Sequence, residues 1–104
     1  MRKNLVVDMA AVEEMVLVIE NNGDLYRNSI KYIIANLQKK YAKGKFDIEL
    51  APKAFESVVV EACKQYHAQY GSPNEKYYTV FNPATREAIA KDLVKGYLEE
   101  IQGL

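Results

Sequence analysis

The chain has 104 residues, 49% of them hydrophobic and 27% charged, a composition that excludes a disordered chain and predicts one globular domain over residues 1–104. Fourteen basic and fourteen acidic residues give a formal net charge of zero, so the overall charge does not indicate a polyanionic partner. The single cysteine, Cys63, excludes an internal disulfide, and the apolar run of residues 15–19 is too short to span a membrane. We therefore expect a cytoplasmic protein with no membrane association.

The first predicted element is a short helix over about residues 8–20. Asp8 is a candidate N-cap residue. Apolar residues then recur at helical spacing, at Met9, Val12, Val16 and Ile19. The β-branched character of residues 16–19, followed by Asn-Asn-Gly, also allows a strand that enters a hairpin. We favour a helix because Glu13 and Glu14 break the alternation that a strand requires.

The second predicted helix, over residues 24–43, has the clearest periodicity. At about 100° per residue, one arc collects the side chains of Tyr26, Ile30, Ile33, Ile34, Leu37 and Tyr41. Gly44 follows this arc in the position of a C-cap glycine. The lysines near the end of the segment suit the negative pole of the helix dipole.

Two further helices are predicted in the second half of the chain. Pro52 suits the first turn of a helix over residues 52–70, because deeper in a helix proline removes a backbone hydrogen bond. The apolar stripe of this helix consists of Phe55, Val58, Val59, Ala62, Tyr66 and Tyr70. Residues 72–81 are expected to form an extended connection, and Asn82-Pro83 then begins a helix that runs to about residue 102. Its apolar face consists of Ile89, Ala90, Leu93, Val94, Tyr97 and Ile101.

These segments predict an all-α fold, a small helical bundle of three long helices plus a shorter N-terminal helix. Gly96 lies inside the last predicted helix, where glycine is less favourable than alanine by about 1 kcal/mol. We expect a close helix crossing at this position, since the missing side chain would let another helix approach.

The sequence contains no recognisable catalytic or metal-binding constellation. Cys63 and His67 are spaced as neighbours on a helix surface, but a structural zinc site requires four ligands and the chain has no other cysteine or histidine. A Cys–His nucleophile pair would need an orienting group and an oxyanion hole that the sequence does not indicate. We therefore predict no cofactor, no metal and no enzymatic activity.

A basic segment and a group of tyrosines are candidate binding features. Residues 25–46 contain six cations and no acid, and among them Arg27, Lys31, Lys39 and Lys43 lie outside the apolar arc. Such a helix face could follow a nucleic-acid backbone, although the acidic segments on either side could neutralise it. Tyr77 and Tyr78 belong to an aromatic group suited to a core edge or an interface.

Arg86 stands out because its helical phase places it in the middle of an apolar arc. A guanidinium in that position must be paired, reach solvent or hold a ligand. A structural ion pair with Asp47, or with Asp24 as second choice, is the interpretation that we favour. A contact with an anion or a partner protein is the alternative.

Several short motifs are spread along residues 20–100. They are Asn22-Gly23-Asp24-Leu25-Tyr26-Arg27, Phe46-Asp47, Leu50-Ala51, Lys53, Phe55, Lys64, Tyr66, Tyr70-Gly71, Phe81, Thr85-Arg86 and Ala90. In these motifs the chain resembles a family of small uncharacterised helical proteins found in bacterial genomes and their mobile elements. Members tend to have Trp-His shortly before the aromatic at Phe81, where this chain has Tyr77-Tyr78. The resemblance implies a helical fold and no particular activity.

We expect a small non-enzymatic binding or adaptor protein that acts through protein–protein contacts, with an unknown protein or a second copy of itself as partner. The alternative is a nucleic-acid-binding accessory protein that uses the basic face of the second helix. The candidate contact residues are Arg86, Arg27, Lys31, Lys39, Lys43, Tyr77 and Tyr78.

Overall fold

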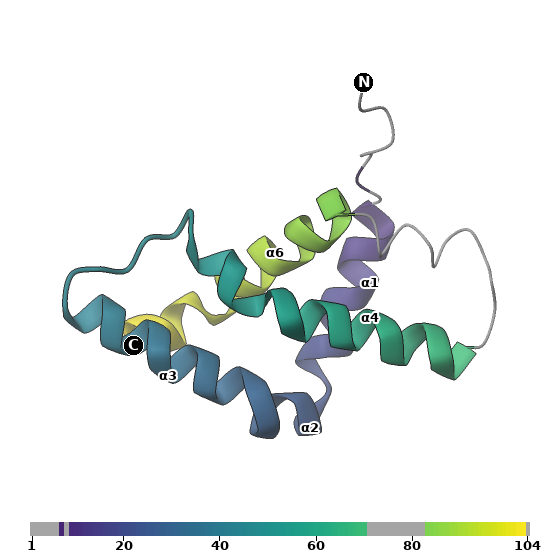
Figure 1. Cartoon of the computed structure of the whole chain (residues 1–104), viewed down its shortest axis with the longest axis horizontal. Helices are drawn as coiled ribbons and strands as arrows, with labels where there is room; N and C mark the ends of the chain where they lie inside the picture. Colours follow the sequence, from purple (N-terminus) through teal and green to yellow (C-terminus); the bar gives the residue numbers. More distant parts are fainter. Residues whose placement is uncertain (1–6, 8, 71–82, 104) are drawn as a thin grey trace.

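The computed structural model describes residues 7, 9–70 and 83–103, which form a set of helices (Figure 1). In chain order these are α1 (Met9–Glu20), α2 (Gly23–Leu25), the π-helix η1 (Tyr26–Ile30), α3 (Lys31–Ala42), the 3₁₀ helix η2 (Ala51–Phe55), α4 (Glu56–Tyr70) and α6 (Pro83–Gln102). The prediction of an all-α fold is confirmed. None of the helices in the described ranges is both long and apolar enough to cross a membrane.

Helix α1 confirms the prediction for the N-terminal segment, and the alternative of a strand over residues 16–19 is wrong. Its buried face consists of Ala11, Val12, Met15 and Ile19, so the predicted Val12 and Ile19 are confirmed, whereas the predicted Val16 is only half-buried. Met9, expected on this face, is 56% exposed because it lies in the first turn, outside the buried face. The expected N-cap, Asp8, lies outside the described residues.

The second predicted helix is a continuous helical stretch made of α2, η1 and α3. It begins one residue earlier than expected, because the Asn22 side chain is the N-cap and accepts a hydrogen bond from the Leu25 N–H at 3.0 Å. At the other end Gly44 has φ +71° and the Lys45 N–H donates to the Lys40 carbonyl at 2.8 Å. This is the C-terminal arrangement that glycine permits, so the C-cap prediction is confirmed.

The third helical segment starts with η2, which contains Pro52, and continues as α4. The prediction that Pro52 lies in the first turn is confirmed. The Phe55 side chain is fully buried and stacks on the Tyr97 ring, with centroids 6.1 Å apart and planes at 6°. The α4 residues that follow it in the core are Val58, Val59, Ala62, Cys63 and Tyr66. The expected end at Gly71 and the connection over residues 72–81 lie outside the described residues.

Helix α6 organises the packing of the bundle. It runs across the molecule in Figure 1 and packs against α1, α3, α4 and η2. Its buried residues are Thr85, Ile89, Ala90, Leu93, Val94 and Ile101. The expected helix crossing at Gly96 is wrong: this glycine is exposed, and the nearest neighbour of a Cβ placed on it would be the tip of the Glu20 side chain.

Candidate functional site

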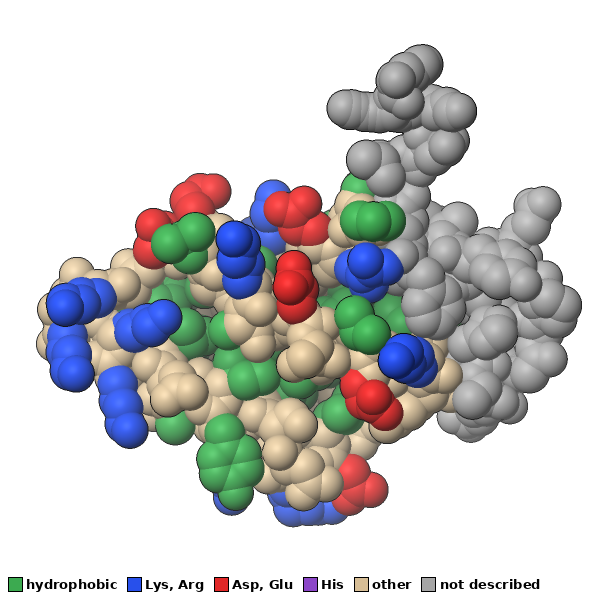
Figure 2. Space-filling model, viewed as in Figure 1, with side chains coloured by type: hydrophobic (Ala, Val, Ile, Leu, Met, Phe, Trp, Pro, Cys, Tyr) green, Lys and Arg blue, Asp and Glu red, His purple; other side chains and the backbone are tan. Residues whose placement is uncertain are grey.

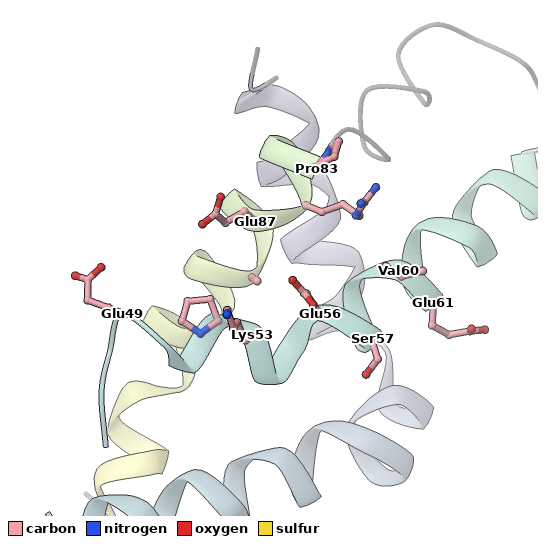
Figure 3. Close-up of a pocket in the computed structure, with 11 residues that line it drawn as sticks. Glu49, Lys53, Glu56, Ser57, Val60, Glu61, Pro83 and Glu87 are labelled. Carbon is pink, nitrogen blue, oxygen red and sulfur yellow. The ribbon is translucent and has the colours of Figure 1, made fainter. Parts of the chain in front are cut away.

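A groove of about 670 Å³ separates the start of α6 from η2 and the first turns of α4 (Figure 3). Its apolar part is formed by Pro52, Val60, Pro83 and Ala90. Pro52 and Ala90 are buried and Val60 is half-buried, so these three side chains form a floor. The groove therefore has the depth and apolar base of a surface that can receive a side chain or a short peptide.

The rim of this groove is charged, and acids predominate. The acidic lining residues are Glu49, Glu56, Glu61 and Glu87. Lys53 and Arg86 are the two cations in the lining, which leaves a formal balance of −2. All four glutamates are exposed, and two of them already have weak local partners: Gln65 donates to Glu61 at 3.0 Å, and Lys91 lies 3.9 Å from Glu87.

Arg86 lies at the edge of the core, not in its middle as the sequence predicted. The fully buried position in the first turns of α6 is Thr85, whereas Arg86 is half-buried and lines the groove. Burial raises the pKa of the Cys63 thiol to about 11, and the nearby Arg86 guanidinium opposes that rise. Arg86 therefore borders both the core and a surface open to a partner.

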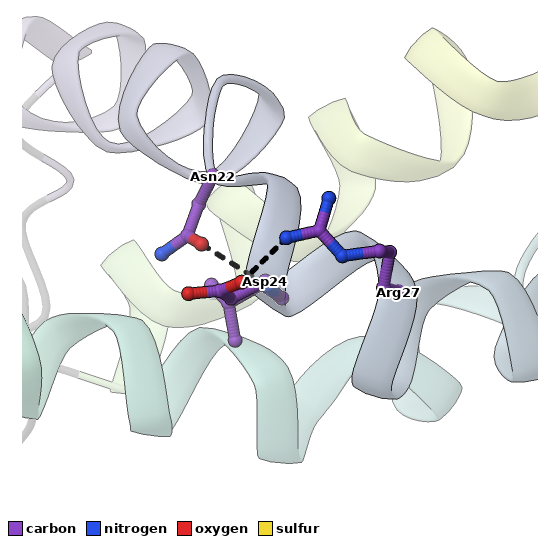
Figure 4. A network of polar contacts seen from close by, with 4 residues as sticks. Asn22, Asp24 and Arg27 are labelled. Carbon is purple, nitrogen blue, oxygen red and sulfur yellow. Dashed lines mark hydrogen bonds and ion pairs between the residues drawn. The ribbon is translucent and has the colours of Figure 1, made fainter.

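The aspartate partners expected for Arg86 are wrong. Asp24 pairs with Arg27 at 2.6 Å in an exposed i,i+3 contact at the start of the second helical stretch (Figure 4). Asp47 is exposed, and its carboxylate accepts the Glu49 N–H at 2.9 Å in the loop before η2. The acids that share the groove with Arg86 are glutamates from three different segments.

The four cations predicted as one basic face belong to two separate places. Arg27 is tied to Asp24, and the Lys31 ammonium lies 5.4 Å from the Tyr32 ring centroid. Lys39 lies about 12 Å further along the stretch than Lys31, and Lys43 about 24 Å further than Arg27, given about 1.5 Å per residue. The four cations had been grouped because they all lie outside the apolar arc, but the length of the helix keeps the two pairs apart.

At the C-terminal end of α3 a separate cluster of cations forms, which we call the basic end. It consists of the exposed residues Lys39, Lys40, Lys43 and Lys45. Figure 2 shows blue side chains gathered at the left of the molecule, over the end of α3 and the loop after it. A hollow of about 430 Å³ beside it is lined by Lys40, Lys45 and Lys53, with Asp47 as the single acid.

The end of α3 and the loop after it expose large apolar side chains that were not predicted to be exposed. Tyr41 is 44% exposed, Ile48 48% and Leu50 58%. Tyr41 had been placed in the buried arc, but it lies beyond the last core contact of α3 and packs edge-on against Phe46 instead. The sequence contains one indication of this exposure. The alternating run Asp47-Ile48-Glu49-Leu50 lies between two helices and continues the apolar pattern of neither.

A third polar cluster ties the helical stretch of residues 23–42 to α6, on residues outside the groove lining. The Tyr26 hydroxyl donates to Glu100 Oε2 at 2.5 Å, which raises the pKa of Tyr26. Burial, with the Glu20 and Glu100 carboxylates, also raises the pKa of Tyr97. These contacts link the second helical stretch to α6.

The candidate residues for a metal site are only partly covered by the part of the chain that the structure describes. No group of three or more histidine, cysteine, aspartate or glutamate side chains is placed there to hold a metal ion. Cys63 is buried, and the side chain of His67 is outside the described set. Tyr77 and Tyr78 also lie outside the described residues.

Comparisons with known proteins give no information on what this protein binds. No protein-family model, no curated protein and no solved structure matches this chain. The resemblance of residues 20–100 to a family of small helical bacterial proteins stays a prediction. What the groove and the basic end can bind is therefore inferred from their shape, charge and apolar content.

Proposed function

We propose that the protein is a small non-enzymatic binding protein of the cytoplasm that holds a segment of a protein partner in the groove between α4 and α6. One observation supports this most directly: an open groove of about 670 Å³ combines an apolar floor with four exposed glutamates and a half-buried arginine. Apolar centres surrounded by charged rims are typical of protein–protein contact surfaces.

The chemistry of the groove defines the segment that it would accept. An apolar side chain would cover Pro52 and Ala90, and flanking lysines or arginines would lie beside the glutamates. The preferred occupant is therefore a cationic, partly apolar peptide segment.

A selection from a random peptide library tests this proposal. We expect peptides enriched in lysine, arginine and apolar residues, binding at about 10–100 µM, with NMR shift changes confined to the groove. Glu56→Lys with Glu61→Lys should abolish binding. The matched control, Glu13→Lys with Glu99→Lys, makes the same change in net charge at two exposed positions outside the groove lining and should bind normally. Peptides that shift other residues, or no enrichment, would contradict the proposal.

The alternative function is nucleic-acid binding, and the basic end is the feature that favours it. Four exposed lysines within residues 39–45 would contact phosphates. Such binding should weaken steeply with salt and disappear in Lys39→Glu with Lys43→Glu. We expect a DNA duplex to show no binding at physiological salt, because the adjoining groove presents four glutamates to the same polyanion.

A further inference from the structure

The charges of this neutral chain are separated on its surface into two unlike regions. The groove has four carboxylates against two cations, whereas the basic end has four lysines. Lys53 lines both the groove and the hollow beside the basic end, so the two regions adjoin. Figure 2 shows the cations of the basic end gathered at the left, whereas acids are spread over the rest of this face among cations and apolar side chains.

The two regions also complement each other in apolar content. The groove has a recessed apolar floor that includes Pro52 and Ala90. Within the basic end the Tyr41 ring is 44% exposed, and Ile48 and Leu50 are exposed in the loop that follows it. One region thus offers a hollow with a negative rim, and the other offers an exposed tyrosine ring among lysines, with two further apolar side chains in the adjoining loop beside Asp47 and Glu49. Interfaces are built from such pairs of apolar centre and complementary charge.

We propose that the groove is occupied by the basic end of a second copy of this chain. This inference rests on the proposed function, because it names the partner of the same groove. Since each copy has both regions on one side, a two-fold arrangement lets each copy insert its basic end into the groove of the other. Such an interface is self-complementary and closes at the dimer.

A second copy fits these observations better than a nucleic acid does. A duplex lying along the basic end would meet the glutamates of the adjoining groove, whose charge repels phosphates. A second copy uses both signs of charge at once, and it also covers the exposed Tyr41, Ile48 and Leu50. The zero net charge of the chain permits this association without overall repulsion.

Sedimentation velocity on the full chain, with paired charge reversals, tests the inference. We expect a dimer with a dissociation constant of about 10–100 µM at low salt, weakened several-fold on raising NaCl from about 50 to about 500 mM. The groove variant, Glu56→Lys with Glu61→Lys, and the basic-end variant, Lys39→Glu with Lys43→Glu, should each weaken the dimer at least about tenfold. The control Glu13→Lys with Glu99→Lys should dimerise like the wild type.

Mixing the two variants gives the decisive result. Groove variant and basic-end variant should form a mixed dimer, because each reversed region then meets its opposite charge in the other chain. All the substituted side chains are exposed, so circular dichroism should show unchanged helicity in every variant. If one variant fails to fold, a chain with all four substitutions replaces the mixture and should dimerise by itself.

Three outcomes would overturn the inference. They are a wild-type chain that stays monomeric at about 1 mM, variants that dimerise as tightly as the wild type, and a mixture that stays monomeric. A monomer that still binds library peptides in its groove would overturn the second copy as partner and leave the proposed function standing. A monomer that binds a DNA duplex through Lys39 and Lys43 would support the nucleic-acid alternative instead.

Discussion

Replacing Gly96 by alanine should stabilise the protein, although glycine in the middle of a long helix suggests a tight contact. Gly96 lies within α6 and is exposed. A Cβ placed on it would lie 2.7 Å from Glu20 Oε2 and 3.9 Å from Glu20 Cδ, with no other atom outside its own helix within 4 Å. Glu20 is itself exposed and its carboxylate is the far end of a flexible side chain, so it can rotate away into water.

The size of the effect can be worked from helix propensity. Alanine is more favourable than glycine inside a helix by about 0.5–1 kcal/mol, because glycine loses more backbone freedom on folding. Moving the Glu20 tip removes little from this gain, since the carboxylate stays hydrated. For a domain of about 100 residues, 1 kcal/mol corresponds to a change of about 4–8 °C in Tm. We therefore expect Gly96→Ala to raise the Tm by about 2–8 °C.

Thermal melts followed by circular dichroism test this prediction, with Gly44→Ala as the matched control. Gly44 has φ +71°, which alanine adopts only with strain, so the free energy of unfolding of Gly44→Ala should be lower by about 1 kcal/mol. A fall in Tm for Gly96→Ala would show that α1 and α6 are too close to admit a methyl group. If the combination with Glu20→Ala restored stability, the Glu20 side chain itself would be the obstacle.

Three further predictions concern the core and the groove. Phe55→Ala should lower the free energy of unfolding, measured by urea denaturation, by about 3–5 kcal/mol, because Phe55 is fully buried against Tyr97. A decrease below about 1 kcal/mol would contradict this packing. Burial raises the pKa of the Cys63 thiol from 9.0 to about 11 and so favours its protonated form. The Tm of the wild type should therefore exceed that of Cys63→Ala by a constant amount below pH 9, and this difference should disappear by pH 11. A Tm difference that does not change with pH would contradict the burial of the thiol. Arg86→Ala should lower the Tm more than Lys91→Ala, because Arg86 is half-buried whereas Lys91 makes only an exposed pair with Glu87, and equal shifts would mean that Arg86 is merely solvated.

The positions of the helices could be predicted from the sequence, because the signals are local. Pro52 restricts its own backbone, and Gly44 permits the left-handed conformation in which α3 ends. The spacing of apolar residues then orients each helix toward the core, as in Ile89, Leu93 and Val94 of α6. These effects act within a few residues, so they can be inferred without knowledge of the fold.

The exact start, the turn type and the phase of each helix could not be predicted from the sequence, because alternative local conformations have similar free energies. The second helix was predicted to begin at residue 24, whereas the Asn22 side chain makes the N-terminal bond to Leu25 and the helix begins one residue earlier. The wider π-turn at residues 26–30 has no simple sequence signature. The fully buried side chain in the first turns of α6 is Thr85, one residue before Arg86, which the helical phase had placed on the buried arc.

The candidate site, by contrast, arises only from the way the helices pack. The groove joins residues 49–61 with residues 83–90, and no local pattern tells which faces of two distant helices will border one hollow. Packing depends on how all the apolar faces fill space together, so the local signals that define each helix do not define the surface between helices.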